Sequence, residues 1–232
     1  RSLQKRPSDR FQSARELAAE LRAFAGSETR GMLGRRASGQ TTDGLLVNQI
    51  RPRGLRAFDR NDAGFFLDLL PGLKDKDGLP ESIRFWKQRI EPEAEFEPFR
   101  VGMLWGPSGS GKSSLVRAGL VPTLSGAVVT TITNARASHL EARILQELGT
   151  RTTGVKESLA ETLGDIRDGG GLPAGNKLFL VVDQFEQFLH RSEHLRRTEL
   201  AECLRQCDGK RVQALLIVRD DFVSAANQFM EM

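Results

Sequence analysis

Residues 106–113 read GPSGSGKS, a glycine-rich stretch that decides the fold. It satisfies the pattern G-x-x-x-x-G-K-[ST] in full, between an apolar segment over 99–105 and an amphipathic segment over 112–120. Glycines let successive backbone N–H groups point inward at phosphate oxygens, and a following helix adds the positive end of its dipole. This context predicts a strand, a phosphate-binding loop and a helix. The residues expected to bind a nucleotide are Gly106, Pro107, Ser108, Gly109, Ser110, Gly111, Lys112, Ser113 and Ser114.

Two side chains of this loop have distinct predicted roles. Lys112, expected to face solvent or ligand, would reach the β- and γ-phosphates, and the hydroxyl of Ser113 would ligate Mg²⁺. A second magnesium anchor is expected at the end of another buried strand. Asp183 follows five apolar residues, LFLVV at 178–182, and we therefore expect it at the carboxyl edge of a parallel sheet, where ligands bind. An ordinary helix cap is the alternative for Asp183.

Two further residues are candidates for catalysis. Glu186 lies one helical turn after Asp183, where it could polarise the attacking water; a plain surface carboxylate is the alternative. Arg219 follows the apolar stretch 212–218 and could sense the γ-phosphate, unless it forms an ordinary ion pair with Asp220 or Asp221. We take Glu186 and Arg219 as the candidate catalytic residues, and Ser113 with Asp183 as the candidate metal ligands.

Strand-type and helix-type patterns alternate along the chain. Strands are expected over 99–105, 127–133, 178–182 and 212–218. Alternation with helical crossovers predicts an α/β fold, a P-loop NTPase-like parallel sheet covered by helices on both faces. P-loop proteins fall into two large divisions, and in one of them an extra strand lies between the strand before the phosphate loop and the strand that ends in the acidic residue. The polar residue at the end of the strand over 212–218 favours this division. The helix signals are Pro80 before Ile83, Trp86 and Ile90; Ser138 with Glu141 as a cap; a stripe of Val155, Leu159, Leu163 and Ile166; and a stripe of Leu200, Cys203, Leu204 and Cys207.

The N-terminal part of the chain differs in character. Residues 8–25 predict a helix in which Ser13 and Glu16 form a capping box. Ten of the 19 residues over 26–44 are Gly, Ser or Thr, which is typical of a flexible linker. We therefore expect a short helical segment over 1–25, a linker over 26–50 and an incomplete α/β core over 51–232.

Composition and charge exclude several classes of function. The longest apolar runs have five residues, whereas a membrane-spanning helix needs about 20, so no membrane contact is expected. Two cysteines are too few for a disulfide scaffold and indicate a reducing compartment, the cytoplasm. Residues 1–60 hold 13 basic and 6 acidic side chains, while residues 61–232 carry a net charge of −3. A near-neutral body argues against a nucleic-acid partner.

The region over 51–232 resembles the STAND class of signal-transduction ATPases, in particular its large bacterial branch. The resemblance rests on RGLRAF at 53–58 with the paired Phe65 and Phe66, on the loop and the following LVRAGL at 115–120, on VVDQFE at 181–186, and on VR at 218–219. Many relatives follow the paired Phe with Gly-Arg, a nucleotide-contacting element, where this chain has Leu67 and Asp68. The chain also stops before the fifth core strand and the winged helix that the resemblance implies.

The first residues resemble a different protein. LQKRPSDRF at 3–11, followed by Ser13, Glu16 and Leu17, is similar to the last helical subdomain of a bacterial serine/threonine protein kinase. The kinase elements H-R-D and D-F-G are absent, so this chain cannot itself phosphorylate protein. The resemblance implies a parent protein that joins a kinase to a STAND ATPase, with protein partners bound through downstream repeats and self-assembly.

These observations predict a slowly hydrolysing, ATP-binding switch domain with ATP and Mg²⁺ as its ligands. Asp183 and Ser113 would hold Mg²⁺, Glu186 the attacking water and Arg219 the γ-phosphate. The sequence leaves other readings open: a P-loop phosphotransferase for a small metabolite, a non-catalytic scaffold that holds nucleotide permanently, and nucleic-acid remodelling.

Overall fold

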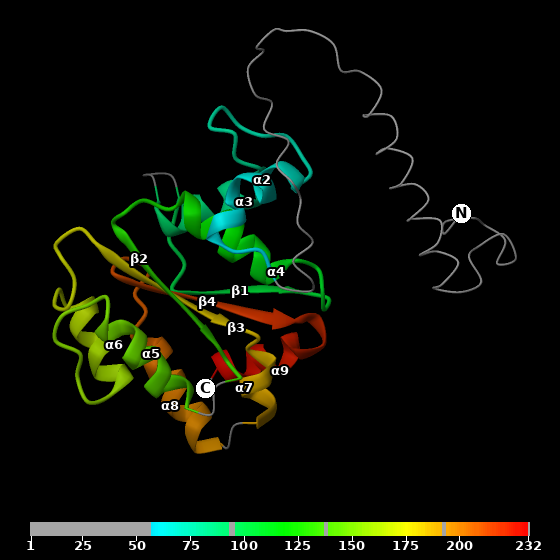
Figure 1. The fold of residues 1–232 in the computed structure, drawn as a ribbon. Helices are drawn as coiled ribbons and strands as arrows, with labels where there is room; N and C mark the ends of the chain where they lie inside the picture. The colour runs from blue at the N-terminus through cyan, green and yellow to red at the C-terminus, as the bar shows by residue number, and fades with distance from the viewer. Residues whose placement is uncertain (1–56, 93–95, 137–138, 192–193, 232) are drawn as a thin grey trace, which may run out of the picture. The chain divides into compact units, whose positions relative to one another are not determined.

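The computed structural model of the protein describes residues 57–92, 96–136, 139–191 and 194–231 (Figure 1). All of them belong to one compact unit, Arg53–Met232. The predicted helix over 8–25 and the linker over 26–50 lie outside the described residues.

The core of the unit is a four-stranded parallel sheet with the order β1-β4-β3-β2. Its strands are β1 (Val101–Gly106), β2 (Val128–Asn134), β3 (Lys177–Asp183) and β4 (Val212–Arg219). The last strand of the sequence lies between the loop strand β1 and the acid-bearing strand β3, as predicted. Gly106 pairs with Arg219, and Asn134 pairs with Asp183. The carboxyl ends of all four strands therefore meet at one edge of the sheet.

Helices connect the strands and cover the sheet. Their bounds are α2 (Ala63–Leu69), α3 (Glu81–Ile90), α4 (Lys112–Ser114), η3 (Leu115–Leu120), α5 (Leu140–Gly149), α6 (Leu159–Arg167), α7 (Glu186–Arg191), α8 (His194–Arg205) and α9 (Val223–Met230). Short 3₁₀ turns are η2 (Arg60–Asp62), η4 (Val121–Thr123) and η5 (Asp220–Phe222). The segment η3 continues α4 but has wider, π-helical turns. No helix in these described ranges is long and apolar enough to cross a membrane.

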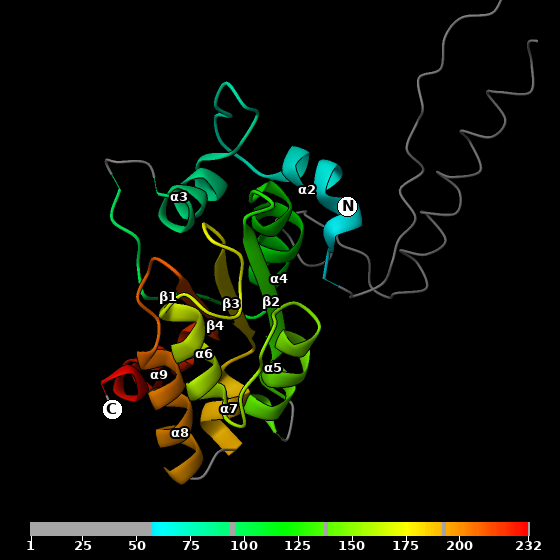
Figure 2. The ribbon, with the colours of Figure 1, turned by 90° about the vertical axis from the view of Figure 1, so that its left-hand side faces the viewer.

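Both faces of the sheet are buried, because successive side chains of a strand point to opposite faces. In β3, Leu178, Leu180 and Val182 pack in the cluster that includes α5, α6, α8 and α9. Phe179 and Val181 pack in the other cluster, with α3 and η3. Figure 2 shows the two layers of helices on either side of the strands. The predicted α/β architecture with two covered faces is confirmed.

Several helix boundaries differ from the prediction. The stripe that begins at Val155 becomes a helix only at Leu159, because Ser158 caps it: the Glu161 backbone N–H donates to Ser158 Oγ at 3.2 Å. Val155 lies outside this helix and is 36% exposed. Helix α5 begins one residue after His139, which makes no side-chain cap bond, and Ser138 is outside the described residues. The helix opened by Pro80 has the predicted buried face.

A polar cluster fixes α3 to the edge of the sheet where the strands begin. This edge is opposite the one where the carboxyl ends of the strands meet. The Lys177 ammonium donates to the Ile90 carbonyl at 2.6 Å and to Gln213 Oε1 at 2.8 Å. The Gln213 amide in turn donates to the Phe99 carbonyl at 2.7 Å. Burial lowers the pKa of Lys177 to about 8. The connection before β1 is therefore held by hydrogen bonds as well as by apolar packing.

Candidate nucleotide site

The phosphate loop needs glycine at two positions. Gly109 and Gly111 have φ values of 77° and 86°, the left-handed region that side chains with a Cβ rarely adopt. Gly111 is also the residue from which α4 begins. These turns bring the chain from β1 into the helix within a few residues, as the motif predicted.

The Lys112 ammonium makes two hydrogen bonds within its own loop. It donates to the carbonyl of Gly106 at 2.6 Å and to that of Pro107 at 2.7 Å. A lysine ammonium carries three donors, and these two carbonyls accept from it. The lysine therefore lies across its own loop, and phosphate would compete with these two carbonyls for it.

The loop borders a pocket of about 500 Å³. Its walls combine residues from the loop, both central strands and the N-terminal segment of the unit. The lining residues are Ala57, Phe58, Phe66, Ser108, Gly109, Ser110, Gly111, Lys112, Ser113, Ser114, Asp183, Gln184, Glu186, Ile217 and Arg219. Most of the predicted site residues are thus brought together; Gly106 and Pro107 lie beside the pocket, where their carbonyls accept from Lys112.

Asp183 and Ser113 meet in this pocket. Ser113 Oγ donates to Asp183 Oδ1 at 2.8 Å, and the Asp183 side chain is 6% exposed. A hydroxyl and a carboxylate are the hard oxygen ligands that Mg²⁺ prefers. The described residues contain no group of three His, Cys, Asp or Glu side chains able to hold a metal by themselves. The pair fits a magnesium ion that takes its other ligands from phosphate and water.

Glu186 is a buried residue, not a surface carboxylate. It is the first residue of α7, is 6% exposed and lines the pocket with Asp183. The residue between them that turns the chain is Gln184, with a φ of 58°, the one non-glycine residue with a positive φ in the described ranges. The Gln184 side-chain oxygen accepts from the Asn134 amide at 3.2 Å, across from the end of β2.

Arg219 lines the pocket but is paired locally. Its guanidinium donates from Nε to Asp221 Oδ1 at 2.9 Å, and a second nitrogen donates to the other oxygen of that carboxylate. This pair holds the pKa of Asp221 below its usual value. The ion pair with Asp221, which the sequence left open as the alternative for Arg219, is therefore present.

Sequence reasoning missed three contacts of the site. The Arg117 guanidinium lies 3.3 Å from Asp183 Oδ2. The Phe58 backbone N–H donates to Ser114 Oγ at 3.1 Å, which ties the N-terminal segment to the loop helix. The rings of Phe58 and Phe66 pack at a centroid distance of 5.5 Å beside the pocket. The position of Arg117 four residues after Ser113 was the available signal, since such residues share a helix face.

Leu67 and Asp68, which stand where many relatives have Gly-Arg, lie away from the pocket lining. Leu67 packs against the apolar cluster of α3 and η3. Asp68 is exposed and pairs with Lys74 at 2.7 Å. Neither residue is among the described residues that line the pocket.

A parallel sheet with an inserted strand, a phosphate loop after β1 and an acid at the end of β3 define a P-loop NTPase. The family model described as "Novel STAND NTPase 1" matches residues 53–232. The chain belongs to this family of NTPases.

Two solved structures to which the chain is similar share little sequence with it. The Walker-type ATPase PABY2304 of Pyrococcus abyssi is 16% identical, with a TM-score of 0.46; the match covers 72% of this chain and 52% of that one. PCH-2 of C. elegans is 14% identical, with a TM-score of 0.40, over 69% of this chain and 42% of that one. The chain thus spans about half the length of these structures. A search of curated protein sequences found no match.

Proposed function

We propose that residues 51–232 form an ATP-binding signalling switch that hydrolyses ATP slowly. The observation that carries the proposal is the meeting of Ser113 Oγ and Asp183 Oδ1 at 2.8 Å in a pocket that Lys112 and Glu186 also line. These four side chains come from the loop helix, from the end of β3 and from the start of α7. They supply a phosphate-binding cation, two magnesium ligands and a base around one space.

Each side chain has one role in the proposal. The Lys112 ammonium exchanges the carbonyls of Gly106 and Pro107 for the β- and γ-phosphate oxygens. Ser113 and Asp183 hold Mg²⁺, which would neutralise phosphate charge as it develops in the transition state. Glu186 accepts the proton of the attacking water.

Arg219 would act as the sensor of the γ-phosphate. The phosphate would replace Asp221 as the partner of the guanidinium, because Arg219 already lines the pocket. An arginine that pairs with the γ-phosphate in one nucleotide state and with Asp221 in the other would favour different conformations of the domain in the two states.

The apolar walls of the pocket suit a planar base. Ala57, Phe58, Phe66 and Ile217 offer such surface next to the loop. A purine base would bury against this surface, which suits a nucleoside triphosphate such as ATP.

The proposal extends to the rest of the chain and its parent. Residues 1–25 would be the end of a serine/threonine protein kinase domain of bacterial type, and 26–50 a flexible linker to the ATPase. ATP would stabilise a state able to assemble and to bind protein partners, and hydrolysis would reset it. The net charge of −3 over 61–232 supports a role without nucleic acid.

The test is a titration of the chain with Mg·ATP, followed by measurement of the phosphate released in a single turnover. Binding with slow release of inorganic phosphate supports the proposal. Transfer of phosphate to a small metabolite, or tightly held ADP that never exchanges, would support the two alternative functions instead.

A further inference from the structure

The two carboxylate oxygens of Asp183 have different partners. Oδ1 accepts from the Ser113 hydroxyl at 2.8 Å, and Oδ2 lies 3.3 Å from a nitrogen of the Arg117 guanidinium. The Asp183 side chain is 6% exposed, whereas that of Arg117 is 33% exposed. A buried carboxylate is thus paired with a cation of the chain itself.

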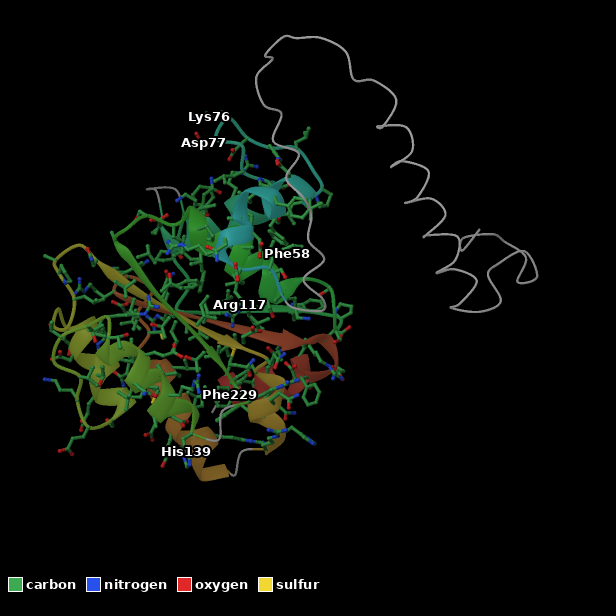
Figure 3. The ribbon with its side chains drawn as sticks, viewed as in Figure 1. Phe58, Lys76, Asp77, Arg117, His139 and Phe229 are labelled. Atoms are coloured by element: carbon green, nitrogen blue, oxygen red, sulfur yellow. The ribbon has the colours of Figure 1, made fainter. Side chains whose placement is uncertain are left out.

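Arg117 contacts Asp183 without lining the pocket itself. Ser113 and Asp183 line the pocket, but Arg117 is not among the described residues that do so. Figure 3 labels Arg117 beside the central strands of the sheet. Ser113 and Asp183 would hold a magnesium ion in the pocket, and Arg117 would remain the partner of Asp183 Oδ2.

The loop helix has an unusual form at this contact. Arg117 lies in η3, where the turns are π-helical, and π-helical turns are rare and often found at functional sites. The same continuous helix begins with Lys112 and Ser113. The arginine is therefore held on the element that carries the phosphate-binding residues.

A cation that is already paired with a buried carboxylate reduces the free energy that a second cation gains by binding to the same carboxylate. Arg117 neutralises part of the charge that would attract Mg²⁺, and the two cations repel each other across the carboxylate. The same arginine keeps Asp183 from being an unpaired buried charge. Both effects reduce the increase in nucleotide affinity that Mg²⁺ would cause.

We propose that Arg117 is a resident counter-cation of Asp183 that limits how strongly nucleotide binding depends on Mg²⁺. The inference rests on the proposed nucleotide site and adds a specificity-determining residue to it. Arg117 lets the site hold nucleotide with little metal, and its loss makes binding more dependent on Mg²⁺.

The test compares the dissociation constants for ATP with excess Mg²⁺ and with a chelator, by calorimetric titration. The dissociation constant in the chelator divided by that in excess Mg²⁺ measures the contribution of Mg²⁺. Arg117→Met removes the charge at similar size, and we expect the ratio to rise on the order of tenfold. Arg117→Lys keeps the charge, and we expect its ratio to stay near that of the unchanged chain. Arg143→Met, which removes a 63% exposed arginine on α5, is the control.

Three results would overturn the inference while leaving the proposed function in place: an unchanged ratio in Arg117→Met, a smaller ratio in that variant, or an equal rise in Arg117→Lys. A smaller ratio would mean that Arg117 orients Asp183 for the metal instead. Arg117→Gln replaces Arg117→Met if that variant does not give a cooperative thermal transition. Failure of the unchanged chain to bind ATP under either condition would overturn the proposed function and this inference with it.

Discussion

Ser113 and Asp183 lie 70 residues apart in the sequence, and Ser113 Oγ donates a hydrogen bond of 2.8 Å to Asp183 Oδ1. The contact follows from the topology of the sheet. Ser113 lies in the helix after β1, Asp183 ends β3, and β4 is the strand between them. Parallel strands place both residues at one edge, so that a hydroxyl and a buried carboxylate meet beside the phosphate loop.

Replacing Lys112 by Ala is expected to weaken Mg·ATP binding by about 100-fold or more, because charge-assisted bonds to two phosphates are lost. The fold should persist, since the lysine contacts only loop carbonyls within the described chain. Calorimetric titration measures the affinity, and thermal unfolding checks the fold. Lys76→Ala is the matched control, because Lys76 is an exposed lysine on the loop before α3 (Figure 3). Equal affinities of Lys112→Ala and the unchanged chain would place the nucleotide elsewhere.

Asp183→Asn keeps the shape of the side chain and removes its charge. We expect the affinity for ATP in excess Mg²⁺ to fall about 10–100-fold, with a smaller change in a chelator. Asp77→Asn, on an exposed loop, serves as the control for loss of a carboxylate. If Mg²⁺ strengthens binding in Asp183→Asn as much as in the unchanged chain, Asp183 is not a magnesium anchor.

The left-handed backbone at Gln184 predicts an unusual order of stability. Gly adopts a positive φ without strain, whereas Ala does not. Gln184→Gly should therefore have a free energy of unfolding about 1 kcal/mol larger than Gln184→Ala, since both lose the bond to Asn134. Urea unfolding measures the difference.

Gln187, in helix α7, provides the opposite case as a control. There Gln187→Gly should be less stable than Gln187→Ala by about 0.5–1 kcal/mol, because Gly costs more entropy in a helix. The same order at both positions would mean that Gln184 does not hold this conformation in solution.

The half-buried Lys177 predicts a dependence of stability on pH. Burial lowers its pKa from 10.5 to about 8, so between these values the unfolded chain binds more protons than the folded one. Its contribution to the free energy of unfolding should therefore rise from pH 8 to pH 10.5 and stay flat below pH 8. Lys177→Met removes the titration and leaves that of other groups. The difference in stability between the two chains, measured in urea at several pH values, should rise over this range; a constant difference would contradict the prediction.

The phosphate loop and the strand that ends in Asp183 could be predicted because each is defined by residues that are adjacent in the sequence. Glycines, a lysine and a hydroxyl in fixed order define the phosphate loop, and five apolar residues before an acid define a buried strand that ends at the sheet edge. The insertion of β4 followed from the polar residue at its end. Such local patterns do not depend on knowing the rest of the packing.

Other features of the site depend on contacts that no local pattern contains. The pair of Arg117 with Asp183 requires a helix and a strand 66 residues apart to meet, and it uses a helical turn that is not α-helical. The bond from Phe58 to Ser114 spans 56 residues. Arg219 had two possible partners in the sequence, phosphate and Asp221, and only the three-dimensional structure shows which one it has without ligand.

Glu186 is buried at the start of α7 and lines the same pocket as Asp183, so the proposed role of Glu186 as a base predicts that binding and hydrolysis can be separated there. Glu186→Gln keeps the size of the side chain and its ability to form hydrogen bonds but removes the base. The most direct measurement is the affinity for Mg·ATP together with the rate of a single turnover, in this variant, in the exposed control Glu161→Gln and in the unchanged chain. We predict that affinity stays within about twofold while the rate falls about 10²–10⁴-fold in Glu186→Gln alone. Hydrolysis by Glu186→Gln at the rate of the unchanged chain would contradict the account.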